Sequence, residues 1–144
     1  KSMDLDRYNL QRFVEAQNPV YQRVLSELRE GRKRTHWMWF IFPQIRGLGH
    51  SELAQRFSIG SLYEAEAYFE HPILGPRLRE CSGLVNAIQN RTIEDIFGYP
   101  DHLKFRSSMT LFAQAVPGEK VFNEALDKYF AGSPDEFTVS RLAQ

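Results

Sequence analysis

The sequence contains a single cysteine, Cys81, among 144 residues, so no disulfide within the chain can stabilise the fold. A chain of this length buries enough apolar surface to fold without disulfides or metal ions. Eighteen Lys and Arg residues balance eighteen Asp and Glu residues. The chain therefore lacks the excess of positive charge with which proteins bind nucleic acids or acidic membranes by releasing counterions.

Long apolar runs are also missing. No stretch approaches the ~20 residues that a membrane-spanning helix needs, and the first residues, KSMDLD, lack the apolar core of a secretion signal. With a single cysteine, these absences predict a cytoplasmic protein that does not interact with membranes. Repeats, low-complexity segments and linkers are absent too, which predicts one domain over residues 3–144, with Lys1 and Ser2 outside it.

Helix signals recur along the whole chain. Segments 20–30 and 119–131 carry apolar residues at helical spacing, and Ser51, Ser61 and Thr92 stand where helix N-caps are expected. Alternating apolar and polar runs are missing, and WFIF (39–42) is the only strand candidate. We therefore predict an all-α or nearly all-α domain of about eight short helices packed orthogonally.

Segment 36–51, HWMWFIFPQIRGLGHS, is unusually aromatic. Its rings fit either a hydrophobic core or the wall of a ligand pocket. In the second interpretation Trp37 and Trp39 stack on a planar base, and Arg46 pairs with a phosphate or carboxylate group. Glycines in the loop and a helix N-terminus near Ser51 would bring backbone N–H groups to the same anion. The predicted ligand-binding residues are Trp37, Trp39, Phe42, Gln44, Arg46, Gly47, Gly49, Ser51 and, from a later segment, Ser108.

A second candidate site lies in segment 101–110, DHLKFRSSMT, which combines charged side chains, Arg106 among them, with hydroxyl side chains. If this segment is helical, Asp101, Lys104 and Ser108 share one face. The predicted catalytic pair is Asp101 and Lys104, one of which would polarise the reacting group. The alternative is a surface ion pair beside Ser and Thr hydroxyls that bond to local carbonyl groups.

The other reactive side chains do not form a pattern that is typical of a catalytic or metal site. The histidines are scattered, so neither a metal site nor a cofactor is predicted. Cys81 falls in a predicted helix with no base beside it, which indicates a buried, inert thiol. The basic run 29–34 is typical of a solvated turn, with phosphate contact as the alternative. Nucleic-acid binding is not expected, and the sequence leaves the oligomeric state open.

Four blocks of the sequence resemble successive blocks of the DUF1810 family: DLDRYNLQRFVEAQNPVY, HWMWFIFPQIRGLGHSELAQRFSI, EAYFEHPILGPRLREC and IFGYPDHLKFRSSMTLFAQA. This resemblance implies a helical domain of bacterial type and of unknown function. Members of the family are sometimes labelled calpastatin. The sequence does not support that label, since a calpain inhibitor of that kind would be a long, disordered, repeat-bearing chain.

A more distant similarity is to the YbiA/NADAR group, small helical proteins linked to ADP-ribose-containing metabolites. It rests on aromatic residues before a Gly-rich turn and a later lysine and methionine, and it transfers no catalytic residues. We expect a small nucleotide-like or ADP-ribose-like ligand between segments 36–51 and 101–110, with hydrolysis of an N-glycosidic bond as the candidate reaction. The alternative is a non-enzymatic protein-interaction module whose aromatic residues are purely structural.

Overall fold

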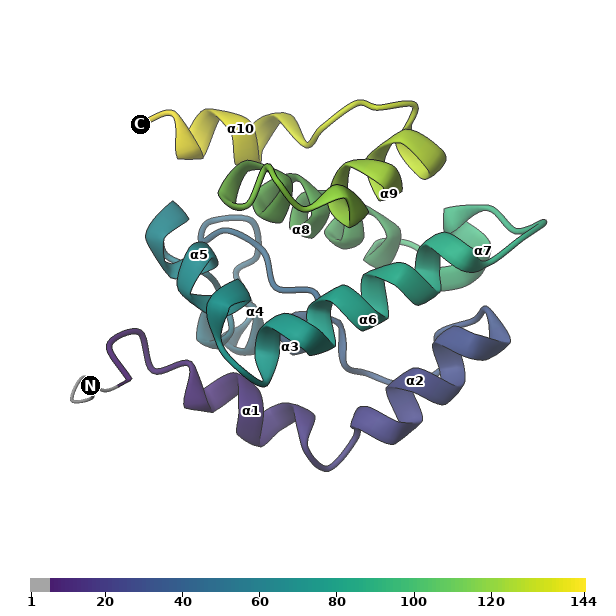
Figure 1. Cartoon of the computed structure of the whole chain (residues 1–144), viewed down its shortest axis with the longest axis horizontal. Coiled ribbons are helices and arrows are strands. Elements are labelled where there is room, and N and C mark those ends of the chain that lie inside the picture. The colour runs from purple at the N-terminus through teal and green to yellow at the C-terminus, as the bar shows by residue number, and fades with distance from the viewer. Residues whose placement is uncertain (1–5) are drawn as a thin grey trace.

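The computed structural model describes residues 6–144, in which ten α-helices surround one interior (Figure 1). They are α1 (Gln11–Gln17), α2 (Tyr21–Glu30), α3 (Met38–Ile41), α4 (Glu52–Arg56), α5 (Leu62–Glu70), α6 (Leu74–Ala87), α7 (Ile93–Phe97), α8 (Asp101–Ala115), α9 (Lys120–Phe130) and α10 (Glu136–Leu142). The all-α prediction is confirmed. The count exceeds the expected eight because α3, α4 and α7 contain only four or five residues each. Residues 3–5 of the predicted domain lie outside the described range, as do Lys1 and Ser2.

Sequence-encoded caps set several helix boundaries. The hydroxyl oxygens of Ser51 and Ser61 each accept a hydrogen bond from the N–H group three residues ahead, at 3.1 Å. Thr92 and Asp95 form a reciprocal capping box with two bonds of 3.0 Å. Gly31 ends α2 in the left-handed conformation, with φ of 84°. These signals act within one helical turn, which is why the sequence alone revealed them.

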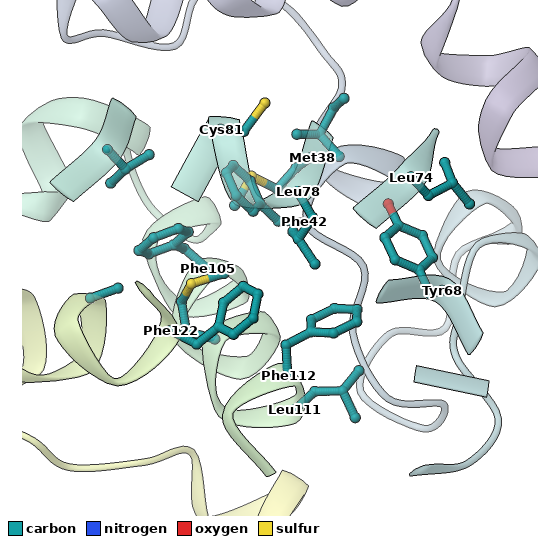
Figure 2. Packing of buried hydrophobic residues seen from close by; sticks show 14 of the residues in the cluster. Met38, Phe42, Tyr68, Leu74, Leu78, Cys81, Phe105, Leu111, Phe112 and Phe122 are labelled. Atoms are coloured by element: carbon teal, nitrogen blue, oxygen red, sulfur yellow. The ribbon is translucent and has the colours of Figure 1, made fainter. Parts of the chain in front are cut away.

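Helix α8 lies at the centre of the packing and contacts α5, α7, α9 and α10. Its Phe112 ring lies 5.4 Å from that of Tyr68 in α5 and 5.7 Å from that of Phe122 in α9, between ring centroids (Figure 2). All three rings are fully buried. None of the helices described in residues 6–144 combines the length and apolarity needed to cross a bilayer.

The strand candidate 39–42 is not a strand, because α3 spans Met38–Ile41. Strand-like pairing occurs instead just after it, in an isolated parallel bridge between Ile45 and Ile59. The Arg46 N–H donates to the Ile59 carbonyl at 2.8 Å, and the Ile59 N–H donates to the Gln44 carbonyl at 2.9 Å. This bridge fixes the loop after α3 against the segment that joins α4 to α5, and so it positions Arg46.

Candidate functional site

The two tryptophans of segment 36–51 lie in different environments. Trp37 is 1% exposed, and its indole N–H donates to Oε1 of Glu27 at 2.9 Å. Phe42 is 0% exposed and packs edge-on against Phe97 and Phe105. Neither Trp37 nor Phe42 offers a ring face to a ligand, so the predicted ligand contact does not fit these positions. Both are core residues, and Trp37 packs against the rings of Phe42 and Phe97.

Trp39 is half-buried and lines a small hollow of about 30 Å³. Four other predicted residues line it as well: Gln44, Arg46, Gly47 and Gly49. The Lys104 ammonium lies 5.2 Å from the centroid of the Trp39 ring, so segments 36–51 and 101–110 do meet at this tryptophan. A hollow of this volume holds one or two water molecules and is too small for a nucleotide base.

A larger groove adjoins the small hollow, and the two share Arg46, Gln55 and Ser58. We call it the Arg46 groove. Its volume is about 540 Å³, within the range of small-molecule sites. Its lining residues are Tyr8, Asn9, Gln11, Arg12, Glu15, Arg46, Gln55, Arg56, Ser58 and Glu64.

Arg12 holds the walls of this groove together. Its guanidinium donates to four backbone carbonyls at 2.7–2.8 Å, those of Tyr8, Asn9, Arg56 and Ser58. It also forms an ion pair with Glu64 at 3.1 Å. The second oxygen of Glu64 accepts from the Gly60 N–H at 2.8 Å. Because all five N–H donors of Arg12 are used, this arginine shapes the groove and has no donor left for a ligand.

Arg46 differs from Arg12 in having no partner. Its side chain is exposed and forms no ion pair or hydrogen bond with any residue in the range 6–144. The guanidinium rests on Gly60, where an added Cβ would lie 2.8 Å from Nη2 of Arg46. The backbone N–H groups of residues 47–50 likewise have no acceptor in the described part of the chain. A free guanidinium beside unused N–H donors is an arrangement that suits an anion.

The predicted catalytic pair belongs to a cluster of ion pairs. Asp101 accepts from the Lys33 ammonium at 2.8 Å and lies 3.4 Å from that of Lys104. The Lys33 ammonium also lies 5.3 Å from the centroid of the Trp37 ring. Neither Asp101 nor Lys104 lines the small hollow or the Arg46 groove. The catalytic assignment therefore has no geometric support, since the Asp101 carboxylate is held between two ammonium groups.

The hydroxyl residues near this cluster are structural. Ser107 and Thr110 donate to the carbonyls four residues earlier, Leu103 and Arg106, at 3.1 and 2.8 Å. Ser108 is 0% exposed, and its hydroxyl has no hydrogen-bond partner among residues 6–144, so it cannot contact a ligand at the surface. The Ser51 hydroxyl is occupied in capping α4.

Two further predictions concern metals and partner proteins. Within residues 6–144, no three His, Cys, Asp or Glu side chains come together in a way that could hold a metal ion. A protein-interaction module would need a continuous apolar surface. Two of the exposed large apolar side chains, Tyr99 and Leu103, lie four positions apart around the start of α8, and the others come from four different segments: Leu53, Tyr63, Ile73 and Phe137. The interaction module stays an untested prediction.

No pattern in the sequence points to Arg12, Glu15, Gln55 or Arg56 as residues of the site. Arg12 and Glu64 are 52 positions apart, and no local pattern connects them. The Ser51 cap did predict a helix over the segment that holds Gln55 and Arg56, but only the bridge between Ile45 and Ile59 brings that segment to Arg46.

Comparison with known proteins identifies the family. The chain is similar to a solved structure, the conserved hypothetical protein Rv1873 from Mycobacterium tuberculosis, with 59% identity and a TM-score of 0.96 over 96% of this chain and 99% of that one. No curated protein matches the chain, and neither finding supports the more distant similarity to the YbiA/NADAR group. The family described as "Protein of unknown function (DUF1810)" matches residues 7–142, and the chain belongs to this family.

Proposed function

We propose that this protein binds a small phosphate-bearing ligand, of nucleotide-like or ADP-ribose-like chemistry, in the Arg46 groove. The observation that carries the proposal is the unpaired guanidinium of Arg46, which lines both the groove and the small hollow beside it. The neighbouring Arg12 uses every donor within the protein, whereas Arg46 keeps its five donors for a ligand.

The local charge also favours an anion. Three arginines and two glutamates line the groove, and one of the glutamates, Glu64, is already neutralised by Arg12. Arg56 supplies a second cation that forms no ion pair within the described residues 6–144, and its guanidinium lies 5.3 Å from the centroid of the Phe57 ring. A guanidinium binds phosphate or carboxylate through two parallel hydrogen bonds, which are stronger than bonds between neutral groups.

We propose that the protein binds this ligand, and we propose no chemical reaction. Hydrolysis of an N-glycosidic bond requires an acid or base within hydrogen-bond reach of the reacting atoms. Asp101 and Lys104, the residues predicted for that role, lie outside the groove lining. Hydrolysis therefore has no support from the two residues that the sequence predicted for it.

Calorimetric titration of the protein with ADP-ribose, NAD and GMP tests the proposal. We expect saturable binding of at least one of these ligands, weakened about 10- to 100-fold by Arg46→Ala, because a charge-assisted hydrogen bond contributes about 1.5–3 kcal/mol. Arg23→Ala is the matched control, since Arg23 is an exposed arginine on α2 and should leave the affinity unchanged. Absence of saturable binding, or equal affinity of the wild type and Arg46→Ala, would refute the proposal.

A further inference from the structure

We infer that the Arg46 groove recognises the sugar phosphate of its ligand and not the base, with Glu15 accepting hydrogen bonds from the sugar hydroxyls. This inference rests on the proposed function and narrows the class of ligand. It follows from two features of the groove, the scarcity of aromatic rings in its lining and the kinds of polar group that are left without partners.

The rings near the groove are already covered. Guanidinium groups lie over two of them: that of Arg12 is 4.3 Å from the Phe13 centroid, and that of Arg56 is 5.3 Å from the Phe57 centroid. Both phenylalanines are buried. Tyr8 is the only aromatic residue that lines the groove itself. Bases bind to proteins mainly by stacking on aromatic rings or guanidinium planes. Since we assign the Arg46 guanidinium to the phosphate, Tyr8 is the ring that this lining leaves for a base.

The indole rings of Trp37 and Trp39 do not provide a surface in the groove on which a base could stack. Trp37 is buried in the core, and Trp39 lines the hollow of about 30 Å³ and not the Arg46 groove. The Lys104 ammonium lies 5.2 Å from the centroid of the Trp39 ring. A base that follows a phosphate bound at Arg46 therefore meets no indole in the lining of the groove itself.

The polar groups of the groove are partly used and partly free. Glu64 is engaged by Arg12 and by the Gly60 N–H, and the Ser58 hydroxyl donates to the Gln55 carbonyl at 2.9 Å. Glu15 is exposed on α1 and has no ion pair or hydrogen bond within residues 6–144. It is therefore the free carboxylate among the residues that line this groove.

A free carboxylate in the same groove as free guanidinium groups matches a ligand that carries both hydroxyl donors and an anion. Vicinal hydroxyls of a pentose donate to a carboxylate, as the 2′-hydroxyl of a nucleotide ribose does in dinucleotide-binding folds. The amides of Asn9 and Gln11 line the same groove and can both donate to and accept from hydroxyl groups. The groove therefore suits a pentose phosphate, whether free or as the terminal part of a larger molecule.

Calorimetry with four probes tests this inference: ribose 5-phosphate, AMP, adenosine and inorganic phosphate. We expect ribose 5-phosphate to bind within about threefold of AMP, and adenosine to bind at least about tenfold more weakly than either. Binding of AMP about tenfold tighter than ribose 5-phosphate would overturn the inference. If Arg46→Ala still abolished AMP binding in that case, the proposed function would stand without it.

The variant Glu15→Gln separates recognition of hydroxyls from recognition of phosphate. We expect it to weaken ribose 5-phosphate about tenfold and to leave the affinity for inorganic phosphate unchanged. Glu124→Gln, at an exposed position on α9, is the matched control and should change neither. Unchanged binding of ribose 5-phosphate by Glu15→Gln would overturn the role of Glu15. Failure of all four probes to bind the wild type would overturn the inference, whereas titration with ADP-ribose, NAD and GMP decides the proposed function separately.

Discussion

At the residue scale, the buried carboxylate of Glu27 explains why Trp37 belongs to the core. Glu27 accepts hydrogen bonds from the Trp37 indole at 2.9 Å, from the Thr35 hydroxyl at 2.7 Å and from the Arg34 N–H at 2.8 Å. Burial opposes the charged form of this carboxylate, but the hydrogen bonds from Arg34, Thr35 and Trp37 outweigh it and lower the pKa of Glu27. One glutamate thus organises the chain between α2 and α3.

The lowered pKa of Glu27 predicts a pH-dependent contribution to stability. A carboxylate with a lowered pKa in the folded state stabilises the fold above its unfolded pKa of about 4.3, and the contribution is lost as the pH falls through the folded pKa. We expect Glu27→Gln to reduce the free energy of unfolding by about 1–3 kcal/mol at pH 7 and by less at pH 3. Urea denaturation at the two pH values measures this difference.

Glu30→Gln is the control for this experiment. Glu30 is exposed and pairs with Arg34 at 3.5 Å, so its replacement should cost less than about 1 kcal/mol at either pH. Equal losses for Glu27→Gln and Glu30→Gln at pH 7 would show that the hydrogen bonds to Glu27 do not carry the stability assigned to them.

At the element scale, the turn from α5 to α6 requires a glycine. A Cβ atom added at Gly75 would lie 1.9 Å from the Phe69 carbonyl oxygen, and this atom belongs to the backbone of α5. The same helix, α6, contains Gly83, where an added Cβ would meet nothing within 4 Å. A side chain is therefore excluded at Gly75 by the backbone of α5, whereas Gly83 has room for one. The sequence alone does not distinguish the two positions.

Alanine substitutions at these two glycines should have opposite effects. We expect Gly75→Ala to destabilise the protein by about 3 kcal/mol or more, because two backbones must separate. We expect Gly83→Ala to be neutral or to stabilise by up to about 1 kcal/mol, since alanine favours the helix over glycine. Thermal denaturation followed by circular dichroism compares them, and a similar melting temperature for both variants would contradict the predicted backbone contact.

Helix signals in the sequence were mostly correct, and their failures have a physical cause. The caps at Ser51, Ser61 and Thr92 were predicted because each acts within three residues. The strand candidate 39–42 failed because a short apolar run fits a buried strand and a buried helix equally well. The bridge between Ile45 and Ile59 was not predicted, since a single pair of residues leaves no alternating pattern.

At the scale of the whole molecule, the rate at which a reagent labels the Cys81 thiol measures how often the protein unfolds. It is buried, and its thiol lies 3.8 Å from the Tyr21 hydroxyl. Burial raises the pKa of the Cys81 thiol to about 12. The thiolate, which is the reactive form, is therefore disfavoured in the folded state. Contacts from α2 and α6 must open before a reagent can reach the sulfur.

We therefore expect a thiol reagent at pH 8 to label Cys81 only as fast as the protein opens, and to label it at once in urea. Gly75→Ala should accelerate labelling in proportion to its loss of stability, and Gly83→Ala should not. Labelling of the folded wild type at the rate of a free thiol would show that the region around α6 opens without global unfolding.

The amino-acid sequence alone determined the helical class and the helix starts at Ser51, Ser61 and Thr92, because caps and periodicity are local features. Tertiary structure decided which residues surround Arg46. Arg12 reaches the backbone of Arg56 and Ser58 across 44 and 46 positions of the chain, and burial separates Trp37 from Trp39, only two positions away. The groove is formed by packing between segments that are distant in the chain. Such packing cannot be predicted from local sequence patterns.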